Sequence, residues 1–170
     1  MYQRQVLLQC EFALIAIEEI NAGVAQRSTD SIHQIFYGIQ NFLNAAANIS
    51  KAFWGTKGKR NLERKALSDS IGVTNTSPLH EVYMRNNFEH FDERLDRWWK
   101  DSSHHNYIDL NIMPRSAIGG VDDNDIFRMF DPTTTDLIFW SERFNIQAIV
   151  NEIQRILQKL KIETAKLHWE

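Results

Sequence analysis

The stretch that decides the fold is residues 32–53, which read IHQIFYGIQNFLNAAANISKAF. Apolar side chains recur there at the three- and four-residue spacing of one helix face: Ile32, Ile35, Phe36, Ile39, Phe42, Leu43, Ala46, Ile49 and Phe53. This apolar sector is wider than a surface helix needs, so we expect the helix to lie centrally in the fold. It should begin between Ser28 and Ser31, where Ser31 and Gln34 have the spacing of a capping box.

Four other segments carry helical signals. Leu7, Cys10, Leu14 and Ile17 have helical spacing. Ser77 followed by Pro78 is a strong helix start, because serine suits the N-cap and proline the first turn. The predicted helices span residues 3–21, about 60–71 up to Gly72, 77 to about 100, and 143–168. We therefore predict an all-α protein, a bundle of about five helices with an up-and-down core.

Residues 101–142 differ from the rest and form a predicted insertion before the last helix. Apolar runs at 126–130 and 137–140 flank the polar turn residues 131–136, which is the pattern of a β-hairpin. We expect a small β-hairpin and loops here, attached to the helical bundle.

Composition limits the classes of function. The chain has 170 residues, which suggests one domain over 1–170, and its net charge of −3 argues against general binding to nucleic acid. Cys10 is the single cysteine, so neither a disulfide within the chain nor a thiolate metal site is expected. No apolar run reaches 18 residues and no signal-peptide pattern is present, which predicts a cytoplasmic protein without a membrane partner.

The hexapeptide Arg85-Asn86-Asn87-Phe88-Glu89-His90 combines a phosphate-binding guanidinium with a proton-transferring imidazole. On one ideal helix Arg85 lies over Glu89, whereas His90 shares its face with Asn86. The core side of that helix would carry Met84, Phe88, Phe91, Leu95 and Trp98. Two interpretations remain open: solvated helix pairs with a surface histidine, or a composite site in which two copies of the chain bring their Arg and His side chains together.

The motif resembles the R-x(4–6)-H signature of HEPN domains, in which a polar residue commonly follows the arginine. The run RNNFEHFDERLDRW at 85–98, after a helix of the type IFYGIQNFLNAAANISKAFW at 35–54, is similar to bacterial HEPN-like proteins, including abortive-infection groups. The order of the predicted helices resembles that family's bundle as well. The resemblance covers most of the chain except 101–142.

The resemblance implies a metal-independent endoribonuclease that works as a homodimer, with no cofactor. Arg85 would hold the scissile phosphate, His90 would move a proton, and Asn86 would orient His90 or contact the phosphate. The attacking group would be the 2′-hydroxyl of the RNA itself. It further implies a toxin or phage-defence component with an antitoxin or nucleotidyltransferase-like partner. The alternative is a catalytically inactive HEPN-like module that dimerises and binds a protein or nucleotide.

Other groups of residues also have to be interpreted. The basic side chains of residues 57–65 are either a solvated surface or an RNA-binding surface: Lys57, Lys59, Arg60, Arg64 and Lys65. Adjacent His104 and His105 point apart on most backbones, and the acidic turn 122–125 lacks the residue order of a calcium loop, so no metal site is predicted. Trp98-Trp99 is expected to be a core corner or dimer contact rather than a base-stacking platform.

Overall fold

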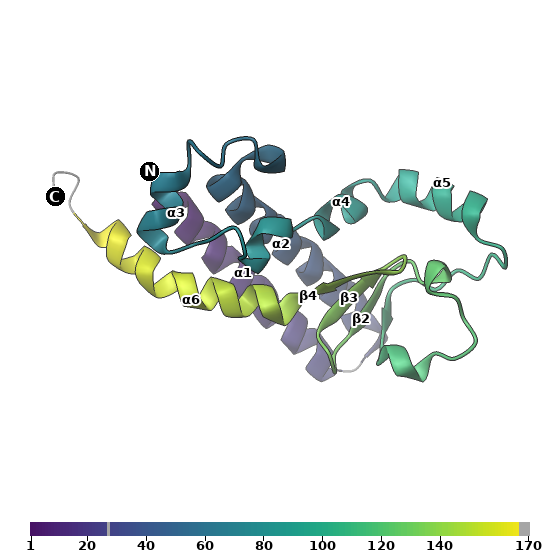
Figure 1. The fold of residues 1–170 in the computed structure, drawn as a ribbon. Coiled ribbons are helices and arrows are strands. Elements are labelled where there is room, and N and C mark those ends of the chain that lie inside the picture. The colour runs from purple at the N-terminus through teal and green to yellow at the C-terminus, as the bar shows by residue number, and fades with distance from the viewer. Residues whose placement is uncertain (27, 167–170) are drawn as a thin grey trace. The chain divides into compact units, whose positions relative to one another are not determined.

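The computed structural model describes residues 1–26 and 28–166, apart from the side chains of Thr29, Lys57 and Glu81. This part of the chain is mostly helical and includes one four-stranded sheet (Figure 1). The helices are α1 Tyr2–Gln26, α2 Thr29–Trp54, α3 Lys65–Ile71, α4 Met84–Glu89, α5 Phe91–Asp101 and α6 Ile146–Ala165. The strands are β1 Asn111–Ile112, β2 Met129–Asp131, β3 Asp136–Phe139 and β4 Glu142–Asn145.

The central helix is confirmed. In α2 every predicted core residue except the half-buried Ile32 is at most 5% exposed. The N-cap of α2 differs from the prediction. The side chain that accepts a backbone N–H of the first turn belongs to Ser28 and not to Ser31: the Ser31 amide donates to Ser28 Oγ at 3.3 Å. The Ser31 hydroxyl instead donates to the Ser28 carbonyl at 2.6 Å. Each serine therefore satisfies a backbone group of the other at this helix start.

Helix α1 extends beyond the predicted residue 21 and passes through Gly23 without ending. A Cβ atom placed on Gly23 would lie 2.5 Å from Cγ1 of Ile35, closer than real Cβ contacts. The glycine thus permits a close approach of α1 to α2 at this point. Cys10 lies fully buried in α1, and burial raises the pKa of its thiol to about 12, so the thiol stays protonated at neutral pH.

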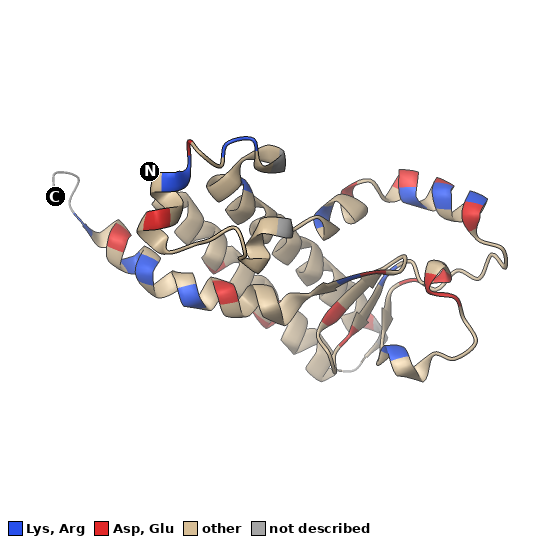
Figure 2. Cartoon of the chain, in the orientation of Figure 1, with Lys and Arg blue, Asp and Glu red and all other residues tan. Residues whose placement is uncertain are grey.

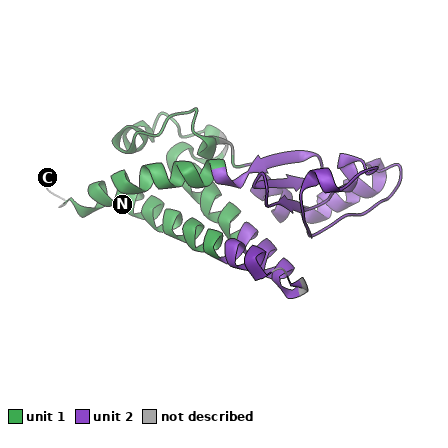
Figure 3. Ribbon diagram, turned by 90° about the horizontal axis from the view of Figure 1, so that it is seen from below, with its two compact units in different colours: residues 1–18, 41–82, 148–170 green, residues 19–40, 83–147 purple. Residues whose placement is uncertain are grey.

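The chain divides into two compact units (Figure 3). The first comprises residues 1–18, 41–82 and 148–170, and the second comprises 19–40 and 83–147. The prediction of one domain over 1–170 stays a prediction.

In the first unit, α3 begins at Lys65, later than the predicted residue 60, because residues 59–64 form turns. It ends as expected at Gly72, whose φ of 75° suits glycine. Beyond it, Ser77 accepts the Leu79 amide at 3.3 Å and donates to Glu152 Oε1 of α6 at 2.7 Å. Arg155 pairs with Glu152 and donates to the Gly72 carbonyl at 3.0 Å. Two α6 side chains therefore fix the segment between α3 and the motif.

The prediction of one helix from residue 77 to about 100 is wrong. Ser77 caps only a short 3-10 helix, Pro78–Glu81, after which Val82 leaves helical geometry with φ −90° and ψ 58°. Helix α4 follows, and a second break at His90 separates it from α5. The strong start signal at Ser77-Pro78 is local, and it does not determine how far a helix continues.

The second unit contains the sheet, in the order β1-β2-β3-β4. The predicted hairpin is confirmed as the antiparallel pair β2–β3, in which Phe130 lies opposite Leu137. The β region is larger than predicted, because β4 adds to β3 and β1 pairs in parallel with β2. Residues 143–145, expected in the last helix, belong to β4, and α6 begins at Ile146. Its predicted last residues, 167 and 168, lie outside the described part. The all-α prediction is thus corrected to a mostly helical fold with a four-stranded sheet.

The hairpin turn is held by Asp131, which is only 4% exposed. Its carboxylate accepts the Thr133 amide and hydroxyl at 2.8 and 2.6 Å, the Thr134 amide at 3.3 Å and the Arg115 amide at 2.9 Å. Burial by itself raises the pKa of Asp131, but these hydrogen bonds outweigh it and the net pKa is lowered. A buried charge is tolerated here because four donors surround it.

Candidate functional site

His90 lies at the break between α4 and α5, where it ends one helix and precedes the other. Its backbone has φ −103° and ψ 40°, outside helical geometry. Its amide still donates to the Asn86 carbonyl at 3.0 Å, and its own carbonyl accepts the Arg94 amide at 3.1 Å. The imidazole is 54% exposed. The break therefore presents the histidine to solvent at a helix junction, a position that sequence periodicity did not predict.

Arg85 and His90 each have a carboxylate neighbour. Arg85 forms the predicted ion pair with Glu89, and its side chain is 21% exposed. His90 Nδ1 lies 3.5 Å from Oε1 of Glu93. Asn86 is exposed. The guanidinium and the imidazole are thus held by separate acids on successive helices.

Asn87 is the motif residue that sequence reasoning missed. It is 4% exposed, its Nδ2 donates to Glu142 of β4 at 2.7 Å, and its Oδ1 accepts from Arg94 Nε at 2.9 Å. On a straight helix Asn87 and Arg94 would be two turns, or about 10 Å, apart along the axis. The contact between them reflects the break at His90, and it ties α4, α5 and β4 together.

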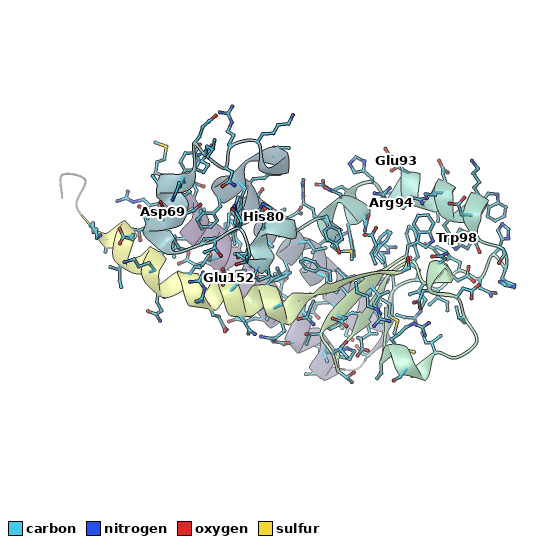
Figure 4. The ribbon with its side chains drawn as sticks, in the orientation of Figure 1. Asp69, His80, Glu93, Arg94, Trp98 and Glu152 are labelled. Carbon is cyan, nitrogen blue, oxygen red and sulfur yellow. The ribbon has the colours of Figure 1, made fainter. Side chains whose placement is uncertain are left out.

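The predicted core side of the motif helix is only partly correct. Met84, Phe88 and Trp98 are buried, and the ring centroid of Phe88 lies 5.5 Å from that of Phe139 in β3. Phe91 and Leu95 are instead 54% and 36% exposed. After the break, Arg94 and Trp98 lie on the side of α5 toward the sheet and Glu93 on the opposite side (Figure 4).

Trp98 and Trp99 have different environments. Trp98 is buried, with its ring centroid 5.0 Å from that of Tyr107. Trp99 is 66% exposed, and its ring centroid lies 4.6 Å from that of His105. Phe91, Leu95 and Trp99 are spaced four residues apart and are all exposed, so they form one apolar row on α5, the α5 row.

The basic segment 57–65 lies in the first unit, whereas the motif lies in the second. Three of its cations already have partners: Arg60 pairs with Glu63 at 2.5 Å, Lys65 pairs with Asp69 at 2.6 Å, and the Arg64 guanidinium lies 3.7 Å from the centre of the Tyr2 ring. Lys59 is exposed, and the Lys57 side chain is outside the described part. Figure 2 shows acidic residues among these cations. The segment is therefore a mixed-charge surface.

A pocket of about 730 Å³ lies within the second unit, between the α1–α2 turn, β1 and the β2–β3 turn. Its walls are mostly apolar and include Val24, Ile32, Ile35, Ile112 and Met113. None of the described residues that line it is acidic, basic or a histidine. These described walls therefore offer shape and apolar surface.

In comparisons with known proteins, no family model, no curated protein and no solved structure matches this chain. Among the described residues, no helix is long and apolar enough to span a membrane. A functional assignment therefore depends on the geometry around Arg85, Asn86 and His90 and on the resemblance of this motif.

Proposed function

We propose that this protein is a metal-independent endoribonuclease of the HEPN type whose active site forms between two copies of the chain. The observation that carries the proposal is the position of His90, half exposed at a helix break and five residues after the guanidinium of Arg85. A solvent-accessible imidazole near a phosphate-binding group is what acid–base cleavage of RNA requires.

Arg85 would bind the scissile phosphate. One of its contacts is the ion pair with Glu89, one helical turn away, and such i,i+4 pairs contribute about 0.3–0.5 kcal/mol. A phosphodiester is singly charged like a carboxylate, and it also accepts two parallel hydrogen bonds from a guanidinium. A bound RNA phosphate would take the place of Glu89, and Arg85 would then stabilise the charge that develops on the phosphoryl oxygens.

His90 would transfer the proton. The 2′-hydroxyl attacks phosphorus, the bond from phosphorus to the 5′-oxygen breaks, and the proton lost by the 2′-hydroxyl is matched by one gained at the 5′-oxygen. The imidazole can take the first proton or deliver the second. Glu93, 3.5 Å from His90 Nδ1, would orient the ring so that the other nitrogen faces the RNA, and Asn86 is exposed for a phosphate contact.

A second copy of the chain would complete the site. In one chain Arg85 pairs with Glu89 and His90 lies beside Glu93, so each of the two motif residues contacts a different carboxylate. A single chain supplies one guanidinium and one imidazole to the proposed site. A two-fold axis beside the helix break would place two of each around one RNA strand. Lys59 and the other basic residues of 57–65 then remain candidates for contacts to the rest of the RNA.

The alternative function, a binding module without catalysis, has one observation in its favour. The α5 row of Phe91, Leu95 and Trp99 is exposed, and Asp92 and Asp96 follow its first two members directly in the chain. An apolar surface with acidic neighbours suits a protein partner with basic residues better than it suits RNA.

The test is cleavage of a mixed panel of RNAs with a chelator present. We expect the wild type to cut and both Arg85→Ala and His90→Ala to lose at least about 100-fold in rate. Arg4→Ala and His33→Ala, which alter an exposed arginine and an exposed histidine elsewhere, should cut like the wild type. An inert wild type, or motif variants that cut as fast as these controls, would refute the catalytic proposal.

Mixing experiments test the composite site. If the two copies share one site, combining Arg85→Ala with His90→Ala protein should restore part of the activity, because mixed dimers again contain an intact arginine and an intact histidine. No recovery after subunit exchange, or a wild type that sediments as a monomer while it cleaves, would eliminate the shared site.

A further inference from the structure

A cluster of possible metal ligands lies in the second unit, away from the motif in sequence. The loop after α5 carries His104, and the 3-10 turn Asp123–Asp125 with its preceding residue carries Asp122 and Asp125. One ligand atom from each of these three side chains lies within 4.8 Å of the others. His104 Nδ1 is 3.5 Å from Oδ2 of Asp122. The sequence did not suggest this group, because His104 lies 18 and 21 residues before Asp122 and Asp125 in the chain.

Asp125 is the member that needs an explanation. It is 2% exposed, yet among the described residues its carboxylate has one hydrogen bond, from the Ser102 hydroxyl at 2.6 Å. The equally buried Asp131 receives four hydrogen bonds. A buried carboxylate with so little compensation is unfavourable unless a cation or further donors come close to it.

The backbone fixes Asp125 to the loop that carries His104. Ser102, itself 7% exposed, accepts the His105 amide at 2.9 Å and donates to Asp125. The Asp125 carbonyl accepts the Ile108 amide at 3.0 Å, and Phe127 donates to the Ile108 carbonyl at 2.7 Å. The hydrogen bonds of Ser102, His105 and Ile108 therefore hold the loop that carries His104 beside Asp125.

We propose that His104, Asp122 and Asp125 bind a divalent transition-metal ion of the zinc type. One imidazole nitrogen and two carboxylate oxygens suit Zn²⁺ better than Ca²⁺ or Mg²⁺, which prefer oxygen ligands alone. Water would fill the remaining position. The ion would neutralise Asp125 and join the loop after α5 to the turn before β2. This proposal is independent of the ribonuclease proposal, because none of the three ligands belongs to the motif.

The three side chains need to move only a short distance to coordinate one ion. Ligands of tetrahedral zinc lie about 3.3 Å apart, given metal–ligand distances near 2.1 Å. His104 and Asp122 are 66% and 68% exposed, so their side chains can rotate toward the buried Asp125. Ser103 Oγ lies 3.0 Å from His104 Nδ1, and coordination through that nitrogen would replace this hydrogen bond.

The test is calorimetric titration of the tag-free, chelator-treated protein with Zn²⁺, followed by Co²⁺ absorption spectroscopy. We expect one ion per chain, visible Co²⁺ bands typical of four-coordinate geometry, and at least tenfold weaker binding for His104→Gln and Asp122→Asn. These two residues are exposed, so their variants should fold. Matched controls are His105→Gln and Asp101→Asn, which alter the adjacent histidine and a nearby exposed acid.

Three outcomes would overturn the metal site: no saturable binding by the wild type, ligand variants that bind like the controls, or Ca²⁺ that binds as tightly as Zn²⁺. RNA cleavage separates this proposal from the previous one. His104→Gln should cut RNA like the wild type in chelator, whereas His90→Ala should bind Zn²⁺ normally and fail to cut.

Discussion

Helix α2 and the helix pair α4–α5 carry similar apolar patterns but have different surroundings. In α2 the predicted core residues from Ile35 to Phe53 are at most 5% exposed. In the pair, Met84 and Phe88 are buried before the break, whereas Phe91 and Leu95 are half exposed after it. The spacing of apolar residues thus shows which side of a helix is apolar, and it does not show whether the helix continues or whether that side is covered.

A polar network accompanies the difference. The buried Asn87 contacts both Arg94 and Glu142, so α4, α5 and β4 meet through hydrogen bonds as well as through apolar packing. In α2 the buried side is made of large apolar side chains such as Phe42 and Phe53, both fully buried. The polar junction leaves His90 exposed, which the proposed chemistry requires.

The largest expected effect is on packing. Phe42→Ala should lower the free energy of unfolding by about 3–5 kcal/mol, because it leaves a cavity in a fully buried site. Phe91→Ala should cost less than about 1 kcal/mol, since the ring is 54% exposed. Urea denaturation of both variants measures the contrast, and equal losses would show that α5 is as well packed as α2.

The second largest expected effect concerns the hydrogen bonds of Asn87 with Glu142 and Arg94. Asn87→Ala should cost about 1–3 kcal/mol, because it leaves Arg94 and Glu142 without their shared partner. The neighbouring Asn86→Ala is the matched control: this side chain is exposed, and its loss should change stability by less than about 0.5 kcal/mol. Thermal unfolding followed by circular dichroism compares the two, and a neutral Asn87→Ala would mean that the network does not hold the break.

Low pH should weaken the contacts that Glu152 of α6 makes with Ser77 and Arg155, in the segment before the motif. The hydrogen bond from Arg155, against a smaller opposing effect of burial, lowers the pKa of Glu152 below its ordinary value of 4.5. A lowered carboxyl pKa contributes stability above the ordinary value, and this contribution is lost as pH falls through the folded-state value. Glu152→Gln should therefore cost about 1 kcal/mol at neutral pH and flatten the dependence of stability on pH below about 4.5. Unfolding curves from pH 7 to 3 test this, and a wild-type slope in Glu152→Gln would contradict it.

The smallest expected effect concerns His90 itself. Because its side chain is 54% exposed and its backbone is already outside the helix, His90→Ala should change the free energy of unfolding by less than about 0.5 kcal/mol. The same substitution should abolish cleavage if the proposed function is correct. A large loss of stability would instead assign the histidine a structural role at the junction.

Much of the fold could be predicted because it depends on neighbours in the chain. Helices α1, α2 and α6, the β2–β3 hairpin and the Arg85–Glu89 pair all follow from residues a few positions apart. The break at His90 was not predicted from spacing, and the contact of Asn87 with Glu142 beside it joins residues 55 positions apart in the chain. The β1 strand was missed for the same reason: it has two residues, and its partner is β2.

By itself, the sequence determined the apolar side of α2, the cap and proline at Ser77-Pro78, the turn at Asp131 and the order of Arg85, Asn86 and His90. These features depend on spacing and on local hydrogen bonds, which the chain carries wherever it folds. Only the tertiary structure decided that Phe91 and Leu95 are exposed, that the cations at 60, 64 and 65 are already partnered, and that His104 meets Asp122 and Asp125. Burial, ion pairing and ligand geometry require residues from distant parts of the chain to come together, and no local pattern specifies which residues those are.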